Sequence, residues 1–350
     1  MSDKLRIAQV APIAGPVTPD YTGSIEQLVW RLTEELVRRG HEVTLFATGD
    51  SRTSAALHAV YARGHNDDGD LWNWEFHEIL HAAAAFERAG DFDVIHSHTY
   101  HYALPFTRLV QTPVVHTYHI LPDDDVARSY ARYPEAQVTA ISHYQRRFFK
   151  DSADVGVIHH GIDTDAFPFN PARGGGYLLF LGRLIPDKGP VEAIHLARRV
   201  GMRLILAGPC DDSEEYFHSE VGPLLDGREV EYVGPVSLRE RNALLADAAA
   251  LVYPILAPEP FGLVLIEAMA CGTPVAALDL GAVPELVDDG VTGACAPDLD
   301  ALAGRLPATL ALDRARIRRV AVARFDCRRM VDDYVALYQR LANQIGRAHV

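Results

Sequence analysis

Residues 251–277 read LVYPILAPEPFGLVLIEAMACGTPVAA and contain one strand, one loop, one helix and a second strand in that order. The short apolar runs Leu251–Tyr253 and Pro274–Ala277 have the length and composition of buried strands. Between them, proline and glycine form a tight loop, and a helix is expected to begin near Phe261. This order is typical of a βαβ unit, so the stretch predicts an α/β fold with a mostly parallel sheet.

The same alternation of strands and helices extends over the whole chain, and it predicts too many strands for a single sheet. The first crossover helix is clear, because apolar residues from Ile25 to Leu36 recur at helical spacing and Gly40 follows two arginines, as at a helix C-terminus. The expected strands are Arg6–Val10, Glu42–Ala47, Asp93–His96, Pro113–Thr117 and Val138–Ile141, followed by Tyr177–Leu181, Arg203–Ala207, Glu231–Val233, Leu251–Tyr253 and Pro274–Ala277.

The pattern breaks between His160 and Gly176, where glycine, proline, aspartate and asparagine replace the periodic apolar residues. We therefore predict an N-terminal domain over residues 1–165 and a C-terminal domain over 172–326, both doubly wound. Residues 327–350 contain a last helix with an apolar stripe, which must pack on something. Periodicity leaves open whether this helix packs on the second domain or crosses back to the first.

Composition restricts the classes of partner. A formal net charge of −14 repels nucleic acid, so a DNA- or RNA-binding role is not expected. The four cysteines are scattered and the chain starts without the features of a signal peptide, which favours a cytoplasmic location. Apolar runs do not approach the roughly 20 residues of a membrane span, so membrane contact would be peripheral at most. Arginines from Arg314 to Arg329 are interpreted as a solvated helix face. The oligomeric state is not indicated.

Ligands of open α/β sheets bind beyond the carboxyl ends of the strands, so the loops that follow the strands are the first place to look for chemistry. The free amides of the helix near Phe261 suit a phosphate. Glu259 precedes this helix, and Glu267 lies about two turns inside it among apolar neighbours, where a charge needs a partner. A carboxylate accepts hydrogen bonds from two vicinal hydroxyls, so one glutamate could hold a ribose and the other a sugar. The alternative is that both are ordinary solvent-facing charges.

A second candidate loop follows the strand Tyr177–Leu181. Gly182 allows close approach of the backbone to a ligand, and Arg183 and Lys188 add two cations to the same loop. Two cations suit a diphosphate, although the loop by itself is equally compatible with two solvated charges.

Together these segments resemble the retaining glycosyltransferases of family four. The likeness runs through nearly the whole chain, and the two glutamates with seven residues between them are its most specific part. Because that family has the GT-B fold, the resemblance implies two Rossmann-like domains with a cleft between them. The matching segments are Gly182-Arg183 with Lys188, Glu259 and Glu267 around Pro-Phe-Gly, Cys-Gly-Thr-Pro-Val at 271–275, and His-His-Gly-Ile-Asp at 159–163.

Carried over residue by residue, the resemblance makes Arg183 and Lys188 the diphosphate clamp and Glu267 the ligand of the ribose. Glu259 would contact the donor sugar, and His119, at the end of Val-Val-His-Thr-Tyr-His, would lie at the same sugar near the reaction centre. The alternative for His119 is a structural histidine held by hydrogen bonds. The phosphate would meet the backbone amides of Phe261, Gly262, Leu263 and Val264.

The loop after the first strand departs from the family pattern. Many members have paired glycines where this chain has Thr22-Gly23, so one position of close backbone approach carries a side chain. Gly23 is still expected to contact the diphosphate or the acceptor, but the departure puts the acceptor side of the site in doubt.

No metal or cofactor is expected. His96-Ser97-His98 and Asp123-Asp124-Asp125 invite a metal interpretation, but the sequence identifies no further ligands for zinc, and consecutive aspartates in a loop are usually solvated. The resemblance agrees, because such enzymes use arginine and lysine in place of a divalent ion. The nucleoside diphosphate sugar, with a UDP-sugar expected first, is then a substrate.

The resemblance thus implies transfer of a sugar from a nucleoside diphosphate sugar to an acceptor hydroxyl with retention at the anomeric carbon. Two alternatives bind the same donor: a nucleotide-sugar epimerase of GT-B form, and a non-catalytic nucleotide-sugar-binding module. An oxidoreductase is less favoured, because no GxGxxG follows a strand.

Overall fold

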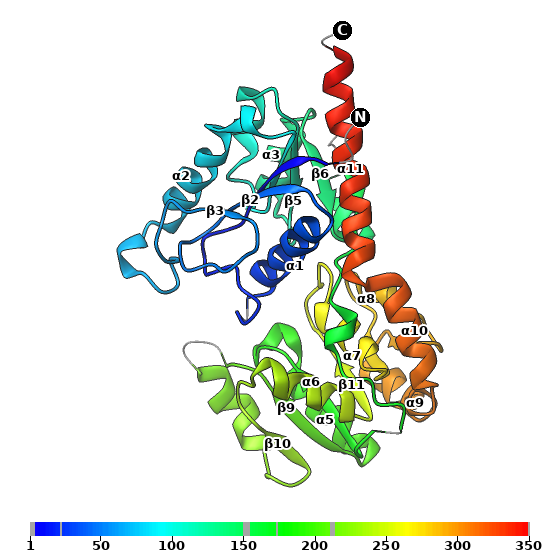
Figure 1. Cartoon of the computed structure of the whole chain (residues 1–350). Coiled ribbons are helices and arrows are strands. Elements are labelled where there is room, and N and C mark those ends of the chain that lie inside the picture. The colour runs from blue at the N-terminus through cyan, green and yellow to red at the C-terminus, as the bar shows by residue number, and fades with distance from the viewer. Residues whose placement is uncertain (1–3, 22, 150–154, 173, 211–213, 349–350) are drawn as a thin grey trace. The chain divides into compact units, whose positions relative to one another are not determined.

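The computed structural model describes residues 4–21, 23–149, 155–172, 174–210 and 214–348. The chain forms two compact units (Figure 1). Unit 1 combines residues 1–161 with 327–350, and unit 2 consists of residues 162–326.

Unit 1 contains a parallel sheet of seven strands in the order β3-β2-β1-β4-β5-β6-β7. The chain starts in the middle of the sheet, builds outward to one edge, and then returns to build outward on the other side. The strands are β1 (Arg6–Val10), β2 (Glu42–Phe46), β3 (Ala56–His58), β4 (Val94–Ser97), β5 (Val114–Thr117), β6 (Gln137–Ala140) and β7 (Val155–Val157), and the α-helices are α1 (Ser24–Arg38), α2 (Trp74–Phe86), α3 (Asp124–Ala131), α4 (His143–Arg146) and α11 (Cys327–Ala348).

Unit 2 repeats this design with six parallel strands in the order β10-β9-β8-β11-β12-β13. In both units the winding direction reverses next to the first strand, between β1 and β4 in one and between β8 and β11 in the other. The strands are β8 (Tyr177–Leu181), β9 (Arg203–Ala207), β10 (Val230–Tyr232), β11 (Ala250–Tyr253), β12 (Val275–Leu278) and β13 (Gly293–Ala296), and the α-helices are α5 (Pro190–Val200), α6 (Leu238–Asp247), α7 (Leu263–Ala270), α8 (Val283–Leu286), α9 (Leu299–Leu310) and α10 (Arg314–Phe325).

The predicted α/β class with two doubly wound sheets is confirmed, and each predicted strand is present within one or two residues. Three strands were not predicted. β3 and β7 are only three residues long, and β13 consists of glycine, alanine and cysteine, so none offers the run of large apolar residues that marks a buried strand.

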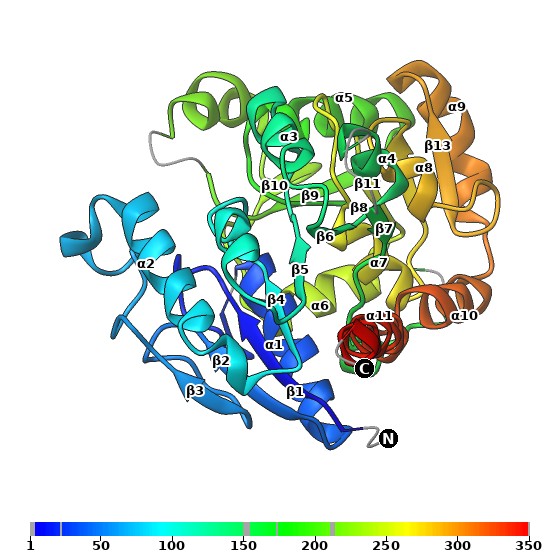
Figure 2. The ribbon, with the colours of Figure 1, turned by 90° about the horizontal axis from the view of Figure 1, so that it is seen from above.

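Helix α11 packs in unit 1, which decides the question that periodicity left open. Its buried residues Met330, Val331, Tyr334 and Tyr338 join the apolar cluster of α1 and the sheet. Figure 2 views α11 nearly along its axis. The expected domain limit at residue 165 falls inside unit 2, because the segment after Gly161 bonds to the end of α10: the Ile162 amide donates to the Phe325 carbonyl at 2.9 Å.

The predicted C-terminus of the first helix is formed as expected. Gly40 has a φ of +89°, its amide donates to the Val37 carbonyl at 2.9 Å, and the His41 amide donates to the Leu36 carbonyl at 3.2 Å. These two bonds form a Schellman motif, which satisfies carbonyls that the helix itself leaves unpaired.

This geometry predicts a cost for a side chain at Gly40. Because a Cβ disfavours the left-handed conformation although nothing lies within 4 Å of it, Gly40→Ala should lower the free energy of unfolding by about 1 kcal/mol. Gly90→Ala is the control, since that glycine also has open space around it but no positive φ. Urea denaturation of both variants measures the difference, and equal stabilities would contradict the explanation.

Candidate active site

The reversal between β8 and β11 places two loops side by side at the carboxyl ends of the strands, where α/β sheets bind ligands. The amide of Leu256, in the loop after β11, donates to the carbonyl of Asp187, in the loop after β8, at 2.8 Å. Both predicted donor loops therefore form one local structure within unit 2.

Lys188 and Glu259 form an ion pair across these loops. The hydroxyl of Tyr253, the last residue of β11, also donates to Glu259 Oε2 at 2.9 Å. Burial, together with the Glu259 carboxylate, raises the pKa of Tyr253 well above its ordinary value, so the phenol stays protonated and remains a donor. Lys188 and Glu259, which were expected at different parts of a ligand, thus bind each other.

Arg183 differs from Lys188, because its side chain is exposed and has no ion pair among the described residues. Gly182 beside it has open space within 4 Å of the position that a Cβ would take. This edge of the loop therefore combines an unneutralised cation with room for a ligand next to the backbone.

Helix α7 begins at Leu263, two residues later than expected, after the N-cap Gly262 with a φ of +103°. This N-cap has no side chain that could satisfy the first amides of the helix, so the amides of Gly262, Leu263 and Val264 are the available anion donors. Phe261 is buried and anchors the loop just before them.

The loop at Gly281 fixes the backbone of Glu259, a role that the sequence analysis missed. Gly281 has a φ of +68°, and a Cβ there would lie 2.4 Å from the Glu259 amide nitrogen. The following amide, of Ala282, donates to the Glu259 carbonyl at 2.9 Å. A side chain at residue 281 would therefore displace Glu259, the residue expected to contact the donor sugar.

Glu267 is buried in α7, as expected, and the protein itself supplies a charged partner. Its Oε1 lies 3.2 Å from an Nη of Arg241 in α6, a residue that the sequence analysis did not single out. No contact of Oε2 is recorded among the described residues, so the pair leaves one carboxylate oxygen for a hydroxyl.

In unit 1, His119 lies in a buried series of histidines rather than alone at the end of a strand. Its Nε2 is 2.9 Å from His98 Nδ1, and its Nδ1 is 3.4 Å from His160 Nε2. Burial lowers the pKa of His119 to about 3, so the ring is neutral. The structural and the ligand-binding interpretations of His119 therefore both stay open, and the longer contact is the weaker of the two.

Gly23, the other candidate in unit 1, is the N-cap of α1. A Cβ at this position would lie 2.1 Å from Glu26 Oε2, and burial raises the pKa of Glu26. A carboxyl group thus occupies the start of α1, which suits an acceptor hydroxyl better than a diphosphate. The neighbouring Thr22 lies outside the described residues.

Comparison with known proteins identifies the family. Residues 25–166 match the model described as Glycosyltransferase Family 4, and residues 175–311 match Glycosyl transferases group 1. The chain belongs to the family 4 glycosyltransferases.

Similar proteins match nearly the whole of this glycosyltransferase. The D-inositol 3-phosphate glycosyltransferase of Mycobacterium avium (strain 104) is 29% identical, over 97% of this chain and 95% of that protein. The phosphatidyl-myo-inositol mannosyltransferase of Mycobacterium leprae (strain TN) is 27% identical, over 99% and 100%. A glycosyltransferase involved in avilamycin A biosynthesis superposes with a TM-score of 0.71 at 27% identity, over 97% and 98%. The sucrose-phosphate synthase of Thermosynechococcus elongatus has the same fold, with a TM-score of 0.80 at 22% identity over 97% and 99%.

Three arginines of α10 correct the expectation of a solvated helix face, whereas Arg316 and Arg319 are exposed as expected. Arg314 donates to the Ala246 and Ala248 carbonyls at the end of α6, at 2.7 and 3.0 Å. Arg318 donates to the Ala270 carbonyl, which ends α7. Arg324 donates to the Glu285 carbonyl in α8 at 2.5 Å. The glycosyltransferase thus uses three arginines of one helix to bind the carboxyl ends of three others, two of which carry Arg241 and Glu267.

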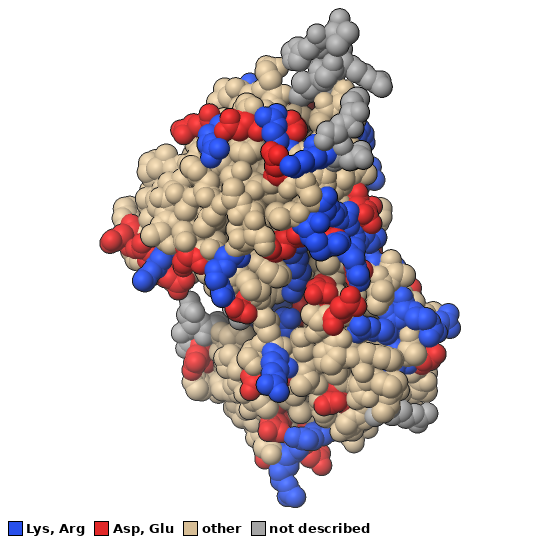
Figure 3. All heavy atoms as spheres, in the orientation of Figure 1, with Lys and Arg blue, Asp and Glu red and all other residues tan. Residues whose placement is uncertain are grey.

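On the face seen in Figure 3, acidic and basic side chains are intermingled. Within the described residues, helices that are both long and apolar enough to cross a membrane are absent.

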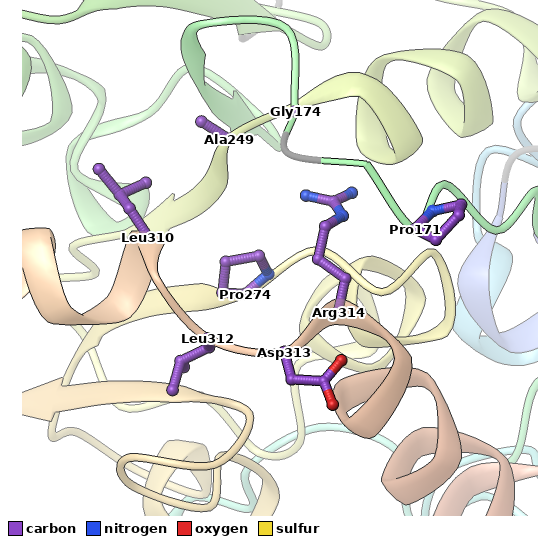
Figure 4. Close-up of a pocket in the computed structure, with 8 residues that line it drawn as sticks. All are labelled: Pro171, Gly174, Ala249, Pro274, Leu310, Leu312, Asp313 and Arg314. Atoms are coloured by element: carbon purple, nitrogen blue, oxygen red, sulfur yellow. The ribbon is translucent and has the colours of Figure 1, made fainter.

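A cavity of about 330 Å³ lies beside Arg314 (Figure 4), but it is not the donor site. Its lining includes Ala249 and Pro274, which precede β11 and β12, so it opens at the amino ends of the strands. The guanidinium also bonds the Asn170 carbonyl at 2.7 Å and Thr273 Oγ1 at 2.7 Å. Its donors are therefore already used by the protein.

Removing this guanidinium should strongly destabilise the protein. Arg314→Met leaves several buried carbonyls without a donor, and each costs roughly 1–3 kcal/mol, so we expect a loss of about 3 kcal/mol or more. Arg316→Met is the matched control, because Arg316 is exposed on the same helix. Chemical denaturation of both variants provides the measurement, and a loss below about 1 kcal/mol for Arg314→Met would show that the carbonyls find other partners.

Proposed function

We propose that this glycosyltransferase transfers a sugar from a nucleoside diphosphate sugar, with UDP as the first candidate nucleotide, to an acceptor hydroxyl with retention at the anomeric carbon. The observation that carries the proposal is the meeting of the loops after β8 and β11. They bring the unpaired Arg183, the amides that begin α7 and the buried Glu267 to one edge of the unit 2 sheet. An anion with an attached diol matches this combination of groups.

The chemistry follows from where charge develops. Breaking the bond between the anomeric carbon and the diphosphate oxygen places negative charge on the leaving group. Arg183 and the amides of Leu263 and Val264 are already in place, so they would stabilise that charge without a rearrangement of solvent. Lys188 contributes to the same field, but Glu259 partly neutralises it in the free enzyme.

In the proposed reaction the acceptor oxygen forms its bond to the anomeric carbon on the face that the diphosphate leaves. The proton of the acceptor hydroxyl passes to an oxygen of the departing phosphate, so atoms and charge balance without a protein nucleophile. Both side-chain hydrogen bonds of Glu259 among the described residues fall on Oε2, which leaves Oε1 for a hydroxyl of the transferred sugar.

The first test is binding, measured by calorimetric titration of UDP, GDP and ADP. Glu267→Gln keeps the size of the side chain but weakens its hydrogen bond to the ribose, so affinity for the preferred nucleotide should fall roughly tenfold or more. Glu229→Gln is the control, because Glu229 is exposed in the same unit. If Glu267→Gln folds normally and binds as tightly as the wild type, the ribose contact is wrong.

Turnover then separates the possible activities. Transfer to an acceptor, or slow hydrolysis of the donor without one, supports the proposal. Release of an epimerised sugar nucleotide would indicate an epimerase instead, and binding with neither reaction would indicate a binding module.

Activity should not depend on a divalent metal, because the proposed charge stabilisation uses Arg183, Lys188 and backbone amides. Transfer measured after treatment with EDTA should equal transfer before it, within error. Loss of turnover with EDTA that magnesium or manganese restores would overturn the assigned role of the two cations.

A further inference from the structure

A chain of buried polar side chains connects the C-terminal helix to His119. Gln9 in β1 lies at its centre: its amide nitrogen donates to the Tyr338 hydroxyl at 3.1 Å, and its Oε1 lies 3.0 Å from His98 Nε2. His98 Nδ1 then meets His119 Nε2 at 2.9 Å. All four residues belong to unit 1, and each is buried.

With the Gln9 amide nitrogen toward Tyr338 and its oxygen toward His98, each proton of the series has one position. Burial lowers the pKa of His98 well below its ordinary value and that of His119 to about 3, so each ring carries a single N–H. An amide oxygen only accepts, so His98 must donate from Nε2 to Gln9 and accept at Nδ1. His119 must therefore donate from Nε2 to His98, which leaves its Nδ1 as an acceptor.

Tyr338 holds the amide of Gln9 in this orientation. Its hydroxyl accepts from Gln9 Nε2 and lies 2.5 Å from His96 Nδ1. When the hydroxyl donates its proton to His96, its oxygen can only accept from Gln9, which favours the amide nitrogen on that side. His96 Nε2 lies 2.8 Å from Thr117 Oγ1, which gives the second ring nitrogen a hydroxyl partner. The Tyr338 hydroxyl therefore contacts both Gln9 and His96. Reversing the Gln9 amide would reverse the direction of every hydrogen bond in this series.

We propose that Gln9 and Tyr338 are positioning residues that fix His119 as its Nε2–H tautomer, so that Nδ1 accepts a hydrogen bond from a hydroxyl of the transferred sugar. The second half of this statement rests on the proposed function, and the first half does not. The sugar hydroxyl would replace the His160 N–H at Nδ1, which at 3.4 Å is the longest hydrogen bond in the series.

The tautomer can be observed directly in the wild-type protein. Two-bond ¹H–¹⁵N correlation spectra of protein labelled in histidine distinguish a protonated ring nitrogen from an unprotonated one, and His119→Gln assigns the signals. We expect a protonated Nε2 and an unprotonated Nδ1 at His119. The opposite pattern would show that the Gln9 amide is reversed, and it would overturn the proposal without any assay of activity.

Two tyrosine variants test whether Tyr338 is responsible. Tyr338→Phe removes the acceptor that orients Gln9, so the His119 signals should show both tautomers. Tyr130→Phe is the control, because Tyr130 is equally buried in unit 1 but its hydroxyl donates to the Tyr100 carbonyl at 2.9 Å, outside this series. Unchanged tautomers in Tyr338→Phe, or equal changes in both variants, would contradict the proposal.

Activity supplies the second measurement. Loss of one hydrogen bond corresponds to roughly a two- to tenfold change in the ratio of the two His119 tautomers. In Tyr338→Phe, kcat should therefore fall by that factor, whereas affinity for the bare nucleoside diphosphate should stay unchanged. If His119→Ala leaves kcat unchanged while the wild type shows the expected tautomer, the positioning chain stands and the sugar contact fails.

Discussion

Carbonyl groups at the carboxyl end of a helix have no partner inside that helix, and unit 2 satisfies this constraint from a single neighbouring element. Arg314, Arg318 and Arg324 of α10 bind the ends of α6, α7 and α8. Cations also suit the negative ends of the helix dipoles. Helix α7 has its amino end at the candidate donor site and its carboxyl end against α10. The contact with α10 therefore holds the helix in place, while the amides at its amino end stay available for a ligand.

Most of the charges in the candidate donor site are already paired within the protein. Lys188 is paired with Glu259, and Glu267 is paired with Arg241, whereas Arg183 has no ion pair among the described residues. A buried charge without a partner would be costly, so the buried Glu267 needs its cation even in the free enzyme, and the partly buried Glu259 gains from Lys188 in the same way. The exposed arginine does not carry this cost, which makes it the natural first contact for an incoming anion.

Much of the fold was predictable, because buried strands and amphipathic helices have periods that appear in the sequence itself. The donor loops were predictable too, since the carboxyl ends of β8 and β11 carry unusual groups. The partners of those groups could not be predicted from the sequence. Arg314 bonds carbonyls 66 and 68 positions away, and Gln9 is distinguished from an ordinary strand residue by its contacts with Tyr338 and His98. Such pairings depend on tertiary packing, for which a single sequence contains no periodic signal.

The histidines of unit 1 illustrate the same limit and also suggest its functional meaning. In the sequence, His96 and His98 invited a metal interpretation, but in the structure their ring nitrogens bind Tyr338, Thr117, Gln9 and His119. Burial keeps these rings neutral. In the proposed reaction positive charge develops at the anomeric carbon as the diphosphate leaves, and a protonated histidine beside the sugar would oppose it. A neutral His119 that accepts a hydrogen bond avoids this repulsion. The positive groups that we propose to stabilise the leaving group all belong to unit 2.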